Sequence, residues 1–396
     1  MIAYNKTWLR NIDIVKKAKR WYAQNLLNDE QFAATILKYP SNFYSPNLFI
    51  KIGLFLFTWI AISATLGVYA LMFSSAFDSP AALPVTAVLY ALASVALLEI
   101  FISNSRIYHS GTDEALLYSG LIATGIAVAG LFNYDIETQG RALLYSLLML
   151  PFLFTAVLRY ADRLVAFLLS LFCYAIFFLL VMKVGAMAKL IMPFAFMILS
   201  LGFYFKARQM KQLDRFFYWK DCIVVFECVA LLMFYISGNY YVIRELSIEF
   251  FEMSLKPGQD IPLAFVFYIF TAGVPLVYVF FGLKRKDKIL LWIGLVLIAA
   301  AVLTFKYYFS LGHPEITLTT AGIIMILVAY VSIKYLKIPK YGITFEEEAD
   351  EDNFLKTNAE ALLVAQSFSR GSTELPEQTE GFGGGQSGGG GAGGGF

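Results

Sequence analysis

The chain is poor in charge and in the side chains of common catalytic sites. Only 15% of its 396 residues are charged, whereas soluble globular proteins average about a quarter. It has two histidines, His109 and His313, and three cysteines, Cys173, Cys222 and Cys228. The cysteines lie in apolar runs without the spacing of a zinc or redox site, so we expect small buried thiols. This composition predicts no metal, no cofactor and no enzymatic activity.

Hydrophobic residues are abundant instead, at 59% of the chain, with aromatics at 17% and a mean hydropathy of +0.65. A bilayer core of about 30 Å requires about 20 apolar residues of helix. Ten runs of roughly this length occur, at about 48–73, 82–103, 114–132, 142–158, 164–182, 187–204, 221–238, 261–282, 289–306 and 317–336. We therefore predict an all-α fold, a polytopic transmembrane helical bundle of about ten spans.

The distribution of basic residues predicts the orientation of these spans. If the spans alternate, 25 of the 31 lysines and arginines fall on the side of the two termini. The other six are Arg141, Lys183, Lys189, Arg244, Lys256 and Lys306. Because basic residues favour the cytoplasmic side of short loops, we expect both termini in the cytoplasm. The predicted location is a cell membrane, with a bacterial inner membrane favoured.

Three regions follow from this pattern. Residues 1–47 are polar and basic and form a cytoplasmic helical segment. Residues 48–338 form the transmembrane domain, which includes an amphipathic helix at about 241–255 on the outer interface. Residues 339–396 form a cytoplasmic tail with an acidic cluster, a short helix and a final stretch 381–396 in which 11 of 16 residues are glycine. Such a stretch buries too little surface to fold, so we expect disorder there.

The N-terminal segment predicts two short helices. In the second, Asn28 and Gln31 have the spacing of a capping box, and Pro40 ends the run. The first, about Lys6–Asn25, is basic and amphipathic, which is typical of contact with anionic lipid. A solvated helix that merely follows the charge bias explains it equally well. Besides the lipid bilayer, we expect a protein partner at the cytoplasmic tail, and no nucleic acid.

Acidic residues within or at the start of spans are the main functional candidates, since a charge at the centre of a span costs about 2.5–3.5 kcal/mol. Glu99 lies near the cytoplasmic end of the second span. Glu227 lies roughly 10 Å into the seventh, at about 1.5 Å per residue from Lys220. Glu114 opens the third span, where a negative charge suits the helix dipole.

Three arginines, Arg106, Arg159 and Arg163, are predicted on the same side as these carboxylates. A structural layer of ion pairs at the cytoplasmic rim would account for all of them, and an ion, proton or substrate site is the other interpretation. The two histidines, His109 and His313, are predicted on opposite sides of the membrane. This excludes a His–His metal pair and leaves no clear catalytic triad.

The order of parts resembles a family of bacterial integral membrane proteins classed as a domain of unknown function, in which a short cytoplasmic helix pair precedes many spans. The resemblance rests on Leu26-Leu27-Asn28-Asp29-Glu30-Gln31, on Ile50-Lys51-Ile52-Gly53 and on Asp113-Glu114-Ala115-Leu116-Leu117. The ending, Gly383 to Phe396, is similar to the glycine-rich tails of several bacterial membrane proteins. Neither likeness implies an activity.

Three functions fit the sequence. The first is a non-enzymatic membrane scaffold that recruits partners through its cytoplasmic ends. The second is a secondary transporter or channel-like protein that uses Glu99 and Glu227, which occupy corresponding helices of a five-plus-five repeat. The third is a membrane enzyme acting on lipid substrates, which is the least favoured because no loop carries paired aspartates.

Overall fold

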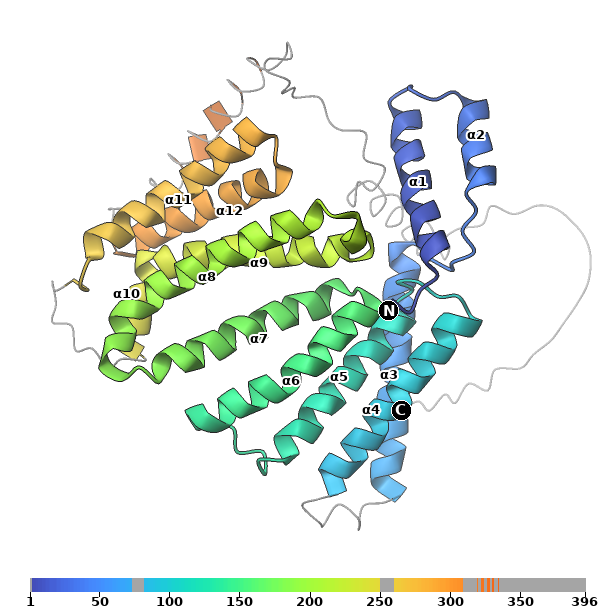
Figure 1. The fold of residues 1–396 in the computed structure, drawn as a ribbon, viewed down its shortest axis with the longest axis horizontal. Helices are drawn as coiled ribbons and strands as arrows, with labels where there is room; N and C mark the ends of the chain where they lie inside the picture. Colours follow the sequence, from blue (N-terminus) through green and yellow to red (C-terminus); the bar gives the residue numbers. More distant parts are fainter. Residues whose placement is uncertain are drawn as a thin grey trace, which may run out of the picture. The chain divides into compact units, whose positions relative to one another are not determined.

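The structure is a computed structural model that describes residues 2–72, 82–249 and 260–308, with isolated helical positions between 319 and 334. Every regular element in these ranges is helical, as the sequence predicts (Figure 1). The chain divides into two compact units, Met1–Asp350 and Glu351–Phe396. The acidic cluster, the short helix and the glycine-rich stretch expected in the tail lie outside the described residues, and the helices below all belong to the first unit.

The α-helices have the following bounds: α1 Lys6–Ala23, α2 Asp29–Lys38, α3 Leu48–Met72, α4 Ala82–Asn104, α5 Thr112–Gly130, α6 Gln139–Tyr160, α7 Arg163–Met182, α8 Ala188–Lys211, α9 Lys220–Gly238, α10 Tyr240–Glu249, α11 Ala264–Arg285 and α12 Lys288–Tyr308. Short 3-10 helices, Gly185–Met187 and Asp214–Trp219, precede α8 and α9.

Nine of these helices coincide with the first nine predicted spans. In the described part of the chain, seven helices are long and apolar enough to cross a membrane, namely α3, α4, α6, α7, α8, α9 and α11. The apolar part of α12 is shorter, Lys288–Thr304, and α5 begins with the acidic Asp113 and Glu114. These helices agree with a multi-pass membrane protein. The predicted tenth span lies almost entirely outside the described residues, so the count of ten stays a prediction.

The two predicted N-terminal helices are present as α1 and α2. The capping box is confirmed, because the Asn28 side chain accepts from the Gln31 backbone and the Gln31 side chain accepts from the Asn28 backbone. The Phe32 ring stacks on Tyr22 at 4.8 Å, which joins the two helices. The amphipathic helix predicted at 241–255 begins as α10, and its remainder lies outside the described residues.

Consecutive helices pack as neighbours, with α4 on α5, α6 on α7, α8 on α9 and α11 on α12 (Figure 1). The helix α5 also packs on α3 and α6, and α9 also packs on α7 and α11. One end of this bundle gathers the starts of α3, α5, α7 and α9 and the ends of α4, α6 and α8. We call this end the basic rim, since it carries Lys51, Arg106, Arg159, Arg163 and Lys211.

The turn from α6 to α7 lies at this rim, where the sequence predicts a short turn between two basic residues. The helix α6 ends at Tyr160, and Ala161 takes a left-handed conformation with φ of 50° that reverses the chain. Asp162 then caps α7, its side chain accepting from the Val165 backbone N–H. This geometry confirms a genuine turn between the fourth and fifth predicted spans.

Candidate functional site

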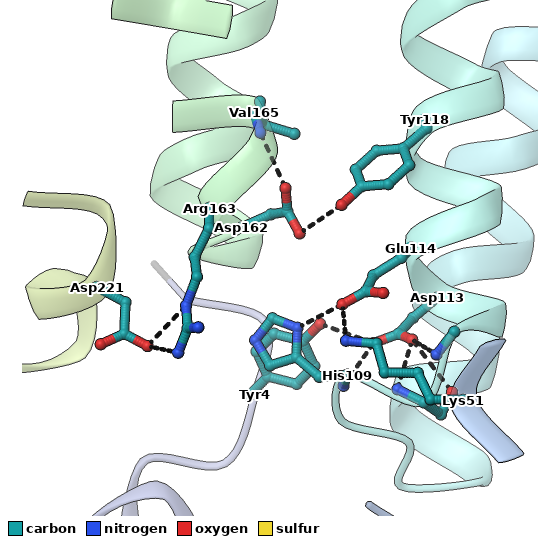
Figure 2. Close-up of polar contacts among 12 residues, drawn as sticks. Tyr4, Lys51, His109, Asp113, Glu114, Tyr118, Asp162, Arg163, Val165 and Asp221 are labelled. Atoms are coloured by element: carbon teal, nitrogen blue, oxygen red, sulfur yellow. Dashed lines mark hydrogen bonds and ion pairs between the residues drawn. The ribbon is translucent and has the colours of Figure 1, made fainter. Parts of the chain in front are cut away.

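A group of buried polar side chains lies at the basic rim (Figure 2). It joins the segment before α1, the start of α3, the loop before α5, the first turns of α5 and the α6–α7 turn. We call it the rim cluster and define it as Tyr4, Lys51, His109, Asp113, Glu114, Tyr118 and Asp162.

Asp113 organises the loop that leads into α5. Its Oδ1 accepts hydrogen bonds from the backbone N–H of Ser110 at 2.9 Å and of Gly111 at 3.2 Å, and from the Ser110 hydroxyl at 3.1 Å. Its Oδ2 accepts from the backbone N–H of His109 at 2.8 Å and from the Tyr4 hydroxyl at 3.3 Å. These donors stabilise a buried carboxylate without a cation, and they fix the loop that carries His109.

Glu114 connects α5 to α3 and to the loop. Its Oε1 lies 2.5 Å from the Lys51 ammonium and 3.0 Å from Nδ1 of His109. All three side chains are mostly buried. This pairing holds the imidazole in place. The backbone of His109 is left-handed, with φ of 49°, a conformation that most residues avoid.

Asp162 approaches the same place from the other side. It is 3% exposed, and its Oδ2 accepts from the Tyr118 hydroxyl at 3.1 Å while Oδ1 caps α7. Burial raises the pKa of this carboxyl, and the hydrogen bonds from Val165 and Tyr118 and the nearby His109 oppose that rise. Asp162 is therefore a buried acid whose ionised form has hydrogen-bond donors but no direct base partner among the described residues.

The N-terminal residues cover the cluster. Tyr4 is buried, and the backbone N–H of Ala3 donates to the carbonyl of Arg159 at 2.7 Å. Burial, and then the negative charge of Asp113, raise the pKa of the Tyr4 phenol well above its usual value, so the phenol stays a hydrogen-bond donor. Ile2 and Tyr4 pack in the same apolar core as Leu98.

The sequence-predicted Glu99 lies beside the rim cluster but belongs to a separate ion pair. Arg159 donates through Nε to its Oε1 and through Nη2 to its Oε2, each at 2.7 Å. The Tyr160 hydroxyl adds a third bond at 2.8 Å. This bidentate geometry is the strong form of an arginine–carboxylate contact, and it joins α4 to the end of α6.

Glu227 also has a basic partner, which comes from the end of α8. The Lys211 ammonium lies 3.2 Å from its Oε2, and Glu227 is only 1% exposed. Nearby, Arg208 pairs with Asp287 at 2.8 Å. The structure therefore brings Glu99 and Glu227 to two different ion pairs, not to one site.

The remaining predicted arginines are not partners of Glu114. Arg163 donates through Nε to Asp221 at 3.0 Å, as Figure 2 shows. The guanidinium of Arg106 lies over the Trp8 ring at 5.3 Å from its centre. Only Glu114 of the predicted residues belongs to the rim cluster, and it takes Lys51 and His109 as partners instead of an arginine.

The rim cluster contains a potential metal-ligand set. One side-chain donor atom each from His109, Glu114 and Asp162 all lie within 4.8 Å of one another. A narrow pocket lined by these three residues, and closed by Tyr4, Tyr160 and neighbours, has no space for a free water molecule. Any ion there would be held directly by the side chains.

A second, apolar pocket of about 610 Å³ lies between α3, α5, α6 and α7. Its walls include Trp59, Tyr145 and Phe172, and Tyr118 also lines it. Because the Tyr118 hydroxyl bonds Asp162, Tyr118 belongs to the rim cluster and to the wall of the apolar pocket.

Sequence reasoning missed Lys51, His109 and Asp162 as members of a site. Asp162 had a usable signal, because an aspartate just before a long apolar run is a common helix N-cap. The sequence predicts the two histidines on opposite sides of the membrane, which excludes only a His–His pair, whereas carboxylates are equally good companions for imidazole in metal sites. Lys51 had no distinguishing signal.

No protein-family model, curated protein or solved structure matches this chain. The resemblance to a bacterial family of unknown function therefore stays a prediction.

Proposed function

We propose that this protein is a non-enzymatic membrane scaffold that holds its N-terminal helix pair, α1 and α2, at the cytoplasmic face as a docking element for a partner protein. The proposal includes cytoplasmic termini and a bacterial inner membrane, as the charge distribution predicts. The observation that carries it is the fixed attachment of this helix pair to the bundle.

Four hydrogen bonds anchor the helix pair to the bundle, two before α1 and two after α2, and a fifth joins α1 to the segment after α2. Before α1, Ala3 and Tyr4 bond to Arg159 and Asp113. After α2, the backbone of Tyr44 pairs with the loop before α5, accepting from Tyr108 at 3.1 Å and donating to the carbonyl of Arg106 at 3.0 Å. The Asn11 side chain also donates to the carbonyl of Pro40 at 2.7 Å.

Such anchoring supports a structural role, because a segment held by backbone bonds at each end loses little further entropy when a partner binds. The helix pair also exposes large apolar side chains. Leu37 is 82% exposed and Leu26 67%, and Trp21 is half-exposed. These side chains of the helix pair and of the turn between its helices are available to pack against a partner protein.

The transporter alternative has less support. It requires a carboxylate that faces a water-reachable interior, but Glu99 and Glu227 are each bonded to a base at the basic rim. In an inverted repeat the two residues would also lie at mirrored depths. An ion-pair layer explains both with no transported species.

Photo-crosslinking tests the docking role. A photoreactive amino acid placed at Leu37 or Leu26 should form a discrete protein adduct in cells, because these positions face outward. The matched control is Lys17, an exposed residue of α1 whose ammonium pairs with Asp13 at 2.8 Å. A photoreactive amino acid at Trp21 should form the same adduct in the otherwise unchanged chain. That adduct should disappear when Leu37→Asp and Leu26→Asp are introduced together.

Two outcomes would contradict the proposal. Crosslinks to lipid alone would show that the helix pair lies on the membrane surface, as the basic character of α1 also allows. Equal adducts from the Lys17 position and from Leu37 would show unspecific collision.

A further inference from the structure

We propose that His109, Glu114 and Asp162 form a binding site for one divalent first-row transition metal ion, with Zn²⁺ as the best fit. This inference does not depend on the docking role of the N-terminal helices, since it concerns side chains beneath them.

The spacing of the donors supports it. At metal–donor distances of about 2.0–2.2 Å, two donors of one ion lie about 3.0–4.3 Å apart. The imidazole Nδ1 and the Glu114 Oε1 are 3.0 Å apart, and the three donor atoms lie within 4.8 Å of one another. A movement of about 0.5 Å for the widest donor spacing, or about 1 Å for a tetrahedral one, would bring them into one coordination sphere. The pocket between them excludes free water, so direct ligation fits better than a hydrated ion.

The three donors come from separate elements, and each is positioned by other groups. Asp113 binds the backbone of the loop that carries His109. The Tyr118 hydroxyl donates to Asp162, and this bond would orient the carboxylate for the proposed ion. Metal-ligating side chains usually have such outer partners, which orient them before the ion arrives. Figure 2 shows the three donors converging from the α5 loop, α5 and the α6–α7 turn.

The charges of the rim cluster point the same way. Three carboxylates, Asp113, Glu114 and Asp162, line the same pocket. Among the described residues, Lys51 and His109 pair with Glu114, and Arg163 is paired with Asp221. Lys51 and His109 both contact Oε1 of Glu114, and in the described part of the chain Oε2 accepts no hydrogen bond. A divalent cation would offset the excess of negative charge and use this oxygen.

The donor set indicates the class of ion. One imidazole with two carboxylates suits Zn²⁺, Mn²⁺ or Fe²⁺, whereas Mg²⁺ and Ca²⁺ favour oxygen donors alone. Zn²⁺ is bound by imidazole and carboxylate donors together, and Oε2 of Glu114 would supply the fourth donor in a pocket too narrow for water.

Metal analysis of the full-length protein in detergent tests this site. After removal of metals by a chelator and dialysis against Zn²⁺, the wild type should retain one equivalent per chain, and its melting temperature should rise with Zn²⁺. His109→Asn and Asp162→Asn should each weaken binding at least 10-fold. Both variants are chosen to preserve the fold, since asparagine tolerates a positive φ at 109 and caps a helix at 162.

Asp221→Asn is the matched control, because it removes a carboxylate of the same rim that lies outside the donor set. It should bind Zn²⁺ as the wild type does. Zn²⁺ binding that is equally tight in both donor variants would place the ion elsewhere, for example on the acidic residues 346–352, and would overturn the proposal. The proposal would also be overturned if the wild-type chain, dialysed against Zn²⁺ or in a parallel sample against Mn²⁺, retained neither ion and kept the same melting temperature.

Discussion

Replacing Lys211 with methionine should destabilise the protein more than replacing its partner Glu227 with glutamine. Glu227 is 1% exposed, and the Lys211 side chain reaches it from the more exposed end of α8. Lys211→Met therefore leaves a carboxylate buried without its base, which typically costs 3–5 kcal/mol. The nearby positive charge of Arg208 attracts Glu227 as well, so we expect the lower end, about 3 kcal/mol.

Glu227→Gln has a smaller cost for a physical reason. It removes the buried charge together with the ion pair, and Lys211 can turn its ammonium toward water. The loss is then one charge-assisted hydrogen bond, about 1.5 kcal/mol. The double variant Lys211→Met/Glu227→Gln should resemble Glu227→Gln, because no unpaired charge remains.

Thermal unfolding of the purified variants in one detergent measures this order. Lys211→Met should melt lowest, with Glu227→Gln and the double variant closer to the wild type. If Lys211→Met melts no lower than Glu227→Gln, the pair does not neutralise a buried charge. If the effects of the single variants simply add in the double variant, Lys211 and Glu227 are not coupled.

Two further predictions concern the loop before α5 and the orientation of the spans. Gly111→Ala should destabilise the protein by about 2 kcal/mol or more, because Gly111 has φ of 98° and a Cβ there would collide with the Lys51 carbonyl and with the Phe55 nitrogen at 2.9 Å. The control is Gly53→Ala, since a Cβ at Gly53 meets nothing within 4 Å. Equal melting temperatures of the two variants would contradict this reasoning. In a cysteine-free background, an impermeant thiol reagent outside the cell should modify Glu249→Cys and spare Lys286→Cys, since the charge distribution puts these exposed positions on opposite sides of the membrane. Modification of Lys286→Cys from outside would refute the predicted orientation.

The helices were predictable because their signal is local. A run of about 20 apolar residues has few alternatives to a membrane-length helix, so the bounds of α3, α7 and α9 differ from the predicted ones by at most two residues. The capping box at Asn28 and Gln31 was equally local, since both partners lie within four residues of sequence. Even the α6–α7 turn followed from the two arginines beside it.

The partners of the charged residues were less predictable, because they depend on how the helices pack. The sequence predicted a layer of carboxylates and arginines on one side, but any of Arg106, Arg159 or Arg163 could serve any acid. Rotation of a helix by one residue turns a side chain by about 100°, which decides whether Arg159 meets Glu99 or Glu114. The structure settles that choice through Tyr160, whose hydroxyl joins the Arg159–Glu99 pair.

The N-terminal residues show a different limit of sequence reasoning. Met1 to Asn5 are too few to show any periodicity, so nothing local indicates that Ile2 and Tyr4 are buried against α4 to α7. Their position depends on Asp113, whose Oδ2 accepts from Tyr4 as well as from the backbone of His109, and on the carbonyl of Arg159 at the end of α6, which accepts from Ala3. Helix ends and buried acids offer hydrogen-bond acceptors at the basic rim, and a short segment that donates to them through Ala3 and Tyr4 can pack its apolar side chains in the core. Residues 2–5 therefore cover the rim cluster, and they would separate a Zn²⁺ ion bound there from solvent.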